Sequence, residues 1–222
     1  MGTLEATASP SPAPPRRRLK EARPAQLIAA AFEVFAEKGF AATRLEDVAR
    51  RAGLAKGTAY LYFPTKEALF KAAIREAVVA RIALGERDVE EWQGTSAELL
   101  RRMLEQWAEV IRTHRGGFLK LIIAEAKNFP DLAEWYQREV ADRGQRLMAA
   151  ILRRGMERGE FRPLDPEATA LVIACPMCFR AISTDALGCH ETQPVPDERF
   201  FATYFDILLA GLKRETSENV KD

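Results

Sequence analysis

Residues 43–63 read TRLEDVARRAGLAKGTAYLYF, and this stretch places two short amphipathic segments on either side of a glycine-containing turn. Thr43 precedes Glu46 by three residues, which is the spacing of a capping box, so a helix is predicted to start here. The apolar residues of 45–52 recur at helical spacing, and a second short helix is predicted over about residues 56–62. Helices this short are marginal alone, so both must pack on neighbouring helices.

A short helix, a tight turn and a second short helix form a helix-turn-helix, whose second helix enters the major groove of DNA. There, Gly57 would let the backbone approach the duplex, while Lys56 and Thr58 could hydrogen-bond to base edges or phosphates. Tyr60 and Tyr62 would offer hydroxyl groups to phosphates or stack against the sugars. The residues predicted to contact DNA are Arg17, Arg18, Thr43, Arg44, Lys56, Gly57, Thr58, Tyr60, Tyr62 and Lys66.

Several of these assignments have a purely structural alternative. Tyr60 and Tyr62 could be half-buried packing residues, and helix capping alone would explain Thr43. Lys66 begins a predicted helix, where backbone N–H groups favour a phosphate but where a lysine is also an ordinary surface residue. Phe63 is predicted to point inward and fix the second short helix to the helix before the motif.

The segments that flank the motif are also helical in pattern. An amphipathic helix is predicted from Pro24 to Gly39, because proline suits a first helical turn and glycine a C-terminal stop. After the motif, Thr65 can cap a helix that begins at Lys66 and continues well past Arg75.

The N-terminus differs in composition from the rest of the chain. Residues 1–15 are rich in Ala, Ser, Thr and Pro, which is typical of disordered chain. The basic segment RRRLKEAR at residues 16–23 is either a solvated charge run or an arm that follows the minor groove of bound DNA. We predict a disordered basic N-terminal arm over residues 1–20.

The remainder of the chain predicts further helices and no strands. Helical spacing recurs over residues 96–113, 118–129, 130–152, 163–187 and 197–213, and no alternating pattern of useful length is present. The fold class is therefore all-α.

Two of the C-terminal helices are unusually apolar. The segments 170–182 and 200–212 are too apolar to face water, and two packed copies of the chain would bury them. This predicts a homodimer, which would suit a palindromic binding site.

The composition limits the class of protein. The chain has 222 residues, 47% of them hydrophobic and 29% charged, and a net charge of +1, so any nucleic-acid surface must be a local patch. Three cysteines are too few for a disulfide framework, and no apolar run reaches the roughly 20 residues that span a membrane. A twin-arginine export signal at Arg16–Arg18 is disfavoured by the charges that follow it. We predict a cytoplasmic protein with no membrane partner.

The same motif resembles a known family. Residues 28–74 look like the DNA-binding domain of the TetR family of bacterial transcriptional regulators. The matching positions, all in register, are Phe35, Gly39, Thr43, Val48, Ala49, Ala52, Gly53, Gly57, Tyr60, Phe63, Lys66, Glu67 and Leu69. The resemblance covers about the first third of the chain. It implies that the rest is a divergent helical domain that dimerises through its last two helices and binds a small molecule.

The resemblance divides the chain and implies a function. Residues 21–68 would form a three-helix helix-turn-helix DNA-binding domain, and residues 69–222 a helical effector-binding and dimerisation domain. The chain would be a repressor that a small, largely apolar effector releases from a palindromic double-stranded operator. The helix that begins at Lys66 would couple the two domains, because it starts beside the DNA and its far end would flank the effector.

An effector site of this kind is largely apolar with a few polar groups. The candidates on the central helices are Met103, Trp107, Ile111, Phe118, Ile122, Trp135, Met148 and Met177, although plain core packing would explain each of them singly. No residues with catalytic spacing and no glycine-rich phosphate loop are present, so we predict neither an enzyme nor a cofactor.

The cysteines leave a second function open. Cys175 and Cys178 have C-x-x-C spacing and Cys189 follows, so a metal- or redox-sensing regulator is conceivable. Free cysteines in an apolar helix more often behave as small hydrophobic residues, and we predict no metal site.

Overall fold

The computed structural model describes residues 16–114, 117–186 and 195–214, and over these ranges the chain is helical with no strand. Its α-helices are α1 (Arg16–Ala42), α2 (Leu45–Arg51), α3 (Thr58–Tyr62), α4 (Lys66–Ile74), α5 (Ala80–Glu91), α6 (Ser96–His114), α7 (Gly117–Glu125), α8 (Pro130–Tyr136), α9 (Asp142–Glu157), α10 (Pro166–Ala186) and α11 (Asp197–Leu212). Two π-helical turns, η1 (Arg75–Val79) and η2 (Gln137–Ala141), join α4 to α5 and α8 to α9. The all-α prediction is confirmed.

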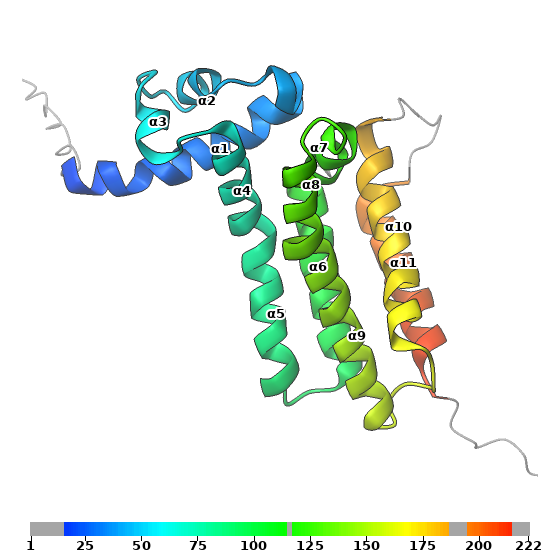
Figure 1. Ribbon diagram of the computed structural model, residues 1–222. Coiled ribbons are helices and arrows are strands. Elements are labelled where there is room, and N and C mark those ends of the chain that lie inside the picture. Colours follow the sequence, from blue (N-terminus) through cyan, green and yellow to red (C-terminus); the bar gives the residue numbers. More distant parts are fainter. Residues whose placement is uncertain (1–15, 115–116, 187–194, 215–222) are drawn as a thin grey trace, which may run out of the picture.

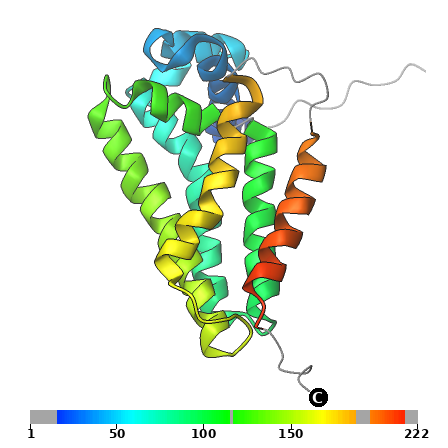
Figure 2. The ribbon, with the colours of Figure 1, turned by 90° about the vertical axis from the view of Figure 1, so that its right-hand side faces the viewer.

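The helices form two regions (Figure 1). α1, α2 and α3 gather at one end of the molecule, and the long helices α5, α6, α9, α10 and α11 run away from them. The view turned by 90° places α10 and α11 on the near face (Figure 2). Because η1 continues α4 into α5, one helical rod runs from the N-terminal region along the bundle, as predicted for the helix that begins at Lys66.

Two hydrophobic cores hold these regions together. The first joins α1–α4 to α7 and α8, with Phe40, Phe70 and Phe118 among its buried residues. The second lies among α6, α9, α10 and α11, with Ile151 and Met177 fully buried. The first core therefore crosses the boundary predicted at residue 68 and ties the N-terminal helices to the bundle.

The first helix starts earlier than the sequence predicted. It begins at Arg16 and contains Pro24, so the prediction that residues 16–20 belong to a disordered arm is wrong. The segment before the proline consists of Arg, Leu, Lys, Glu and Ala, which are strong helix formers. The predicted stop is confirmed, because Gly39 has φ +75° and interrupts the helical backbone.

The N-cap of α2 lies one residue after the predicted cap, although the helix itself begins at Leu45, as the helical spacing of residues 45–52 predicted. Arg44, not Thr43, is the N-cap, and its backbone N–H donates to the Asp47 carboxylate over 3.3 Å. The Thr43 hydroxyl instead donates to the Gly39 carbonyl over 2.6 Å and is almost fully buried. The Thr43–Glu46 capping box is therefore wrong.

Candidate DNA-binding surface

α2 is fixed against α1 by burial and by charge. Leu45, Val48 and Ala49 are buried on one side of α2. On the other side Arg51 binds the Glu33 carboxylate of α1 at 2.7 Å. This double attachment gives a helix of only seven residues a defined position, as a short helix requires.

α3 has one face turned into the protein and one turned outward. Thr58 and Ala59 expose 8% and 0% of their surface, whereas Tyr60 exposes 50% and Leu61 79%. At about 100° per residue, Gly57 projects from the outward side between Tyr60 and Leu61. The outward face, defined here as Gly57, Tyr60 and Leu61, is the part of α3 that a duplex can touch.

Gly57 is not required by the fold itself. Its φ of −73° suits any residue, and a Cβ atom built there would meet no other atom within 4 Å. Its lack of a side chain therefore leaves exposed backbone at the centre of the outward face. This is consistent with the predicted close approach of the backbone to DNA.

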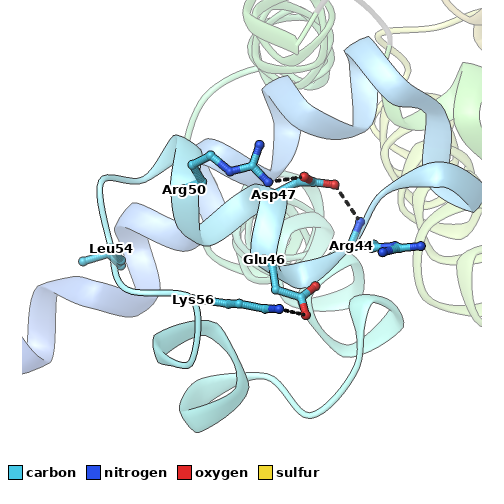
Figure 3. A pocket seen from close by; sticks show the side chains of 6 residues that line it. All are labelled: Arg44, Glu46, Asp47, Arg50, Leu54 and Lys56. Carbon is cyan, nitrogen blue, oxygen red and sulfur yellow. Dashed lines mark hydrogen bonds and ion pairs between the residues drawn. The ribbon is translucent and has the colours of Figure 1, made fainter.

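A charged depression lies beside α3 (Figure 3). It has a volume of about 350 Å³, and it is lined by Arg44, Glu46, Asp47, Arg50, Leu54 and Lys56. Its basic side chains form ion pairs with its acidic side chains. Lys56 lies 3.5 Å from Glu46, and Arg50 lies 2.7 Å from Asp47, which also binds Lys38 at 3.0 Å.

Both carboxylates of the depression are held in the ionised form. The pKa of Glu46 is lowered mainly by its own backbone N–H, with further hydrogen bonds from Tyr60 and Lys56. The pKa of Asp47 is lowered mainly by the hydrogen bond from Lys38. Because the ion pairs are exposed, they are weak, and Lys56 and Arg50 can exchange a carboxylate for a phosphate.

Lys66 has a different position from the one predicted. Its ammonium donates to the carbonyls of Phe40 and Ala41 over 2.9 and 2.8 Å, and it lies over the rings of Phe40 and Phe129 at 4.8 and 5.5 Å. Its assignment as a phosphate contact is therefore wrong for this structure. Lys66 stabilises the C-terminal turn of α1, where the Phe40 carbonyl also accepts from the Thr43 N–H at 3.3 Å.

Apart from Lys66, the predicted DNA contacts thus fall into four groups. Arg44, Lys56, Gly57 and Tyr60 are exposed around the outward face. Thr43 and Thr58 are buried, so neither presents its hydroxyl to a duplex, and these two assignments are corrected. Tyr62 and Phe63 are half-buried against the first core, as the packing alternative expects for Tyr62 and as predicted for Phe63. Arg17 and Arg18 lie in the first turns of α1.

Two residues of this surface were missed by the sequence analysis. Arg50 lines the depression, and Leu61 is the most exposed large hydrophobic residue of the described chain. Helical spacing within α3 could have found Leu61, because it lies almost opposite Ala59, which the first core buries.

The predicted effector residues belong to two different cores. Phe118, Ile122 and Trp135 belong to the first core. The second core contains or contacts the others, Met103, Trp107, Ile111, Met148 and Met177. The structure therefore distributes these residues over two cores, and their part in an effector site stays a prediction. Apolar helical spacing shows that a residue is buried but not in which core it lies.

A small cavity does lie between the two regions of the molecule. Its volume is about 30 Å³, enough for about one water molecule. It is lined by residues of α1, α4, α6 and α7, namely Phe32, Phe35, Ala36, Phe70, His114, Gly117, Phe118 and Leu121. Burial lowers the pKa of His114, with Arg81 adding a smaller effect, and this favours the neutral form of the ring, which contacts Phe32 and Phe118.

The metal- or redox-sensing alternative gains no support. Cys175 is exposed and Cys178 half-buried on α10, while Cys189 lies outside the described residues. Among the residues described, no group of three metal-binding side chains comes together. Burial raises the pKa of the Cys178 thiol, which disfavours a reactive thiolate.

None of the helices described is both long and apolar enough to cross a membrane.

Replacing Gly57 by alanine should separate DNA affinity from stability. The new methyl group would keep the backbone away from a duplex, and we expect about a tenfold loss of affinity, the value of one hydrogen bond. The free energy of unfolding should change by no more than about 0.5 kcal/mol, because the space around Gly57 is empty. Fluorescence anisotropy and urea denaturation measure the two quantities. Gly144→Ala on α9 is the control, and an equal loss of affinity in both variants would contradict the role of Gly57.

Comparison with known proteins matches both regions of the chain. Residues 27–73 match the family model described as "Bacterial regulatory proteins, tetR family". Residues 93–191 match the model described as "Tetracyclin repressor-like, C-terminal domain". The first match contains α2 and α3 with most of α1 and α4, and the second contains α6–α10.

Individual proteins are similar over most of the chain. The helix-turn-helix regulator YfiR of Bacillus subtilis (strain 168) is 27% identical over 153 residues, which are 68% of this chain and 73% of the relative. The fatty acid metabolism regulator protein of the same organism is 28% identical over 148 residues, 65% and 74% of the two chains. The solved structure of the fatty acid degradation regulator FadR from Bacillus halodurans has a TM-score of 0.67 and 23% identity, and covers 86% of this chain and 97% of its own. At that identity the structural likeness shows the fold alone.

Proposed function

Because the chain belongs to the TetR family of bacterial regulatory proteins and is a transcriptional regulator, we propose that it is a repressor released from a palindromic operator by a small apolar effector. One observation carries the DNA-binding part. The outward face of α3 stands beside a depression whose basic side chains, Arg44, Arg50 and Lys56, can turn to phosphates. The proposed site of action is the cytoplasm, where bacterial DNA lies.

The proposed complex places α3 in the major groove. Phosphate contacts from Arg44, Arg50 and Lys56 would set the position of α3, and the outward face would meet base edges. The first turns of α1, with Arg17 and Arg18, extend beyond α3 (Figure 1), where they could reach the neighbouring backbone or minor groove.

The proposal is tested by the salt dependence of operator binding, with an operator obtained by selection from random duplexes. Lys56→Ala should weaken binding to all duplexes and lower the log–log salt slope by about one phosphate contact per protomer, because fewer counterions are released. Lys213→Ala is the matched control, because Lys213 directly follows α11, whose C-terminal end lies away from α1–α3 (Figure 1). Failure to select any preferred duplex would contradict the function, and an unchanged slope would contradict the role of Lys56.

The proposed effector acts where the two regions meet. The cavity between α1, α4, α6 and α7 holds about one water molecule, so an apolar ligand must separate these helices to enter. That movement would shift α1 and α4 together, because Lys66 at the start of α4 is bonded to the C-terminal turn of α1. The position of the helix-turn-helix formed by α2 and α3 would change with them.

Straight-chain fatty acids are the first effectors to test, because a relative that is 28% identical to this chain is a fatty acid metabolism regulator. A true effector must weaken operator binding by the factor by which operator weakens effector binding, typically 5–150-fold. Calorimetric titration with and without operator measures both. A fatty acid with equal affinity in the two titrations would not be the effector.

A further inference from the structure

Leu61 has an exposure that the fold does not explain. It exposes 79% of its surface, more than any other large hydrophobic residue in the described chain, and it belongs to neither core. Two of its neighbours along α3 do pack into the protein, since Ala59 is buried and Tyr62 is half-buried. An apolar side chain this exposed adds little to the stability of the monomer, and it is available to contact a partner.

The surroundings of Leu61 indicate the kind of partner. Gly57 and Tyr60 share the outward face with it, and the basic Arg44 and Lys56 stand at the neighbouring depression. This combination of cations, exposed backbone and a phenol fits a polyanion with polar edges better than an apolar protein surface. Under the proposed function that polyanion is DNA, with α3 in its major groove.

Leucine restricts which base group it can meet. Its side chain has no donor or acceptor, so it cannot bind a phosphate or hydrogen-bond to a base edge. The one apolar group that a base displays in the major groove is the C5-methyl group of thymine. Gly57 beside it lets the α3 backbone come close enough for a side chain of this length to reach the groove floor.

We propose that Leu61 packs against the C5-methyl group of a thymine in each half of the operator and is a specificity-determining residue of this regulator. The inference rests on the proposed DNA-binding function and deepens it. Its contribution is that of burying about one methyl group, which corresponds to about a fourfold change in affinity for each half-site.

The experiment is a double-mutant cycle between protein and DNA. The operator is selected from random duplexes with the wild-type protein, and each thymine of one half-site is replaced in turn by deoxyuridine, which removes only the methyl group. Wild-type protein should lose about fourfold in affinity at one position. Leu61→Ala should lose affinity for the thymine operator and show no further loss with deoxyuridine at that position.

Two controls make the result specific. Leu84→Ala removes an exposed leucine from α5, away from α3, and should retain the full deoxyuridine effect (Figure 1). Because Leu61 is exposed, its truncation should leave the circular dichroism spectrum and melting temperature unchanged. Titrations at low salt keep weakened complexes measurable.

The outcomes distinguish a failure of the proposed function from a failure of the assignment of Leu61. If the protein selects no duplex, both the inference and the proposed function are wrong. If it selects an operator but wild type and Leu61→Ala lose the same affinity at every deoxyuridine position, the function stands and the assignment of Leu61 is overturned. A methyl-dependent loss that disappears only in Leu61→Ala establishes the contact.

Discussion

Replacing Phe179 by arginine should convert the regulator from a dimer to a monomer and weaken binding to a two-half-site operator by about a hundredfold or more. The effect is large because the second half-site is bound at a high effective concentration once the first is occupied, and a monomer loses that gain. Binding to an isolated half-site should be almost unchanged, since Phe179 lies on α10 and α3 is untouched.

The reason for choosing Phe179 is the surface that it occupies. On α10, Leu171, Val172 and Phe179 expose 52%, 69% and 65% of their surface, and on α11 Ile207 exposes 66%. The two helices lie on the near face in Figure 2. The two helices are joined within the monomer, because the Tyr204 hydroxyl donates to the Ile173 carbonyl over 2.6 Å. A rigid apolar surface of this kind suits a two-fold interface, and an unpaired arginine buried there would be costly.

Sedimentation velocity at micromolar concentration measures the oligomeric state, and anisotropy measures operator affinity. Leu84→Arg is the matched control, because Leu84 is 45% exposed on α5, on a different side of the bundle, and its replacement should leave a dimer. A wild-type protein that sediments as a monomer, or a Phe179→Arg variant that remains a dimer, would contradict the proposed interface.

Local patterns predicted the helix-turn-helix well because its contacts are close in sequence. The stop at Gly39 follows from its positive φ, and Thr65 caps α4 as predicted, with its hydroxyl accepting from the Ala68 N–H at 3.1 Å. The cap of α2 moved by one residue because Asp47 supplies the acceptor that Glu46 was expected to supply. Competition between adjacent polar residues is not visible in spacing alone.

Long-range contacts account for what the sequence could not predict. Lys66 meets carbonyls 25 and 26 residues earlier in the chain, and no local pattern distinguishes such a lysine from one that faces DNA. Similarly, Trp107 and Phe118 both have the helical spacing of buried residues, yet they pack in different cores. Which helices meet is decided by tertiary packing, and so is the set of residues that can line one site.

The surroundings of Lys66 link the two regions of the molecule. Lys66 itself donates to the C-terminal turn of α1. Next to it, the Phe40 and Phe129 rings meet edge to face at a centroid distance of 4.8 Å. The Glu125 carboxylate also accepts from the Ala41 N–H at 3.3 Å. The turn between α7 and α8 thus contacts the same carbonyl-rich turn of α1, and Lys66 lies between them as a cation over both rings.

Replacing Lys66 by methionine should therefore lower the free energy of unfolding by about 2 kcal/mol, because it removes two charge-assisted hydrogen bonds and the cation–π contacts while keeping the apolar stem. For a chain of this size that corresponds to a melting temperature lower by about 4–8 °C. Thermal and urea unfolding measure the change. Lys127→Met, at an exposed position beyond α7, should change stability by less than about 0.5 kcal/mol. If Lys66→Met were as stable as this control but lost operator affinity and salt slope, Lys66 would be a phosphate contact after all, and its assignment as the residue that fixes α4 to α1 would be wrong.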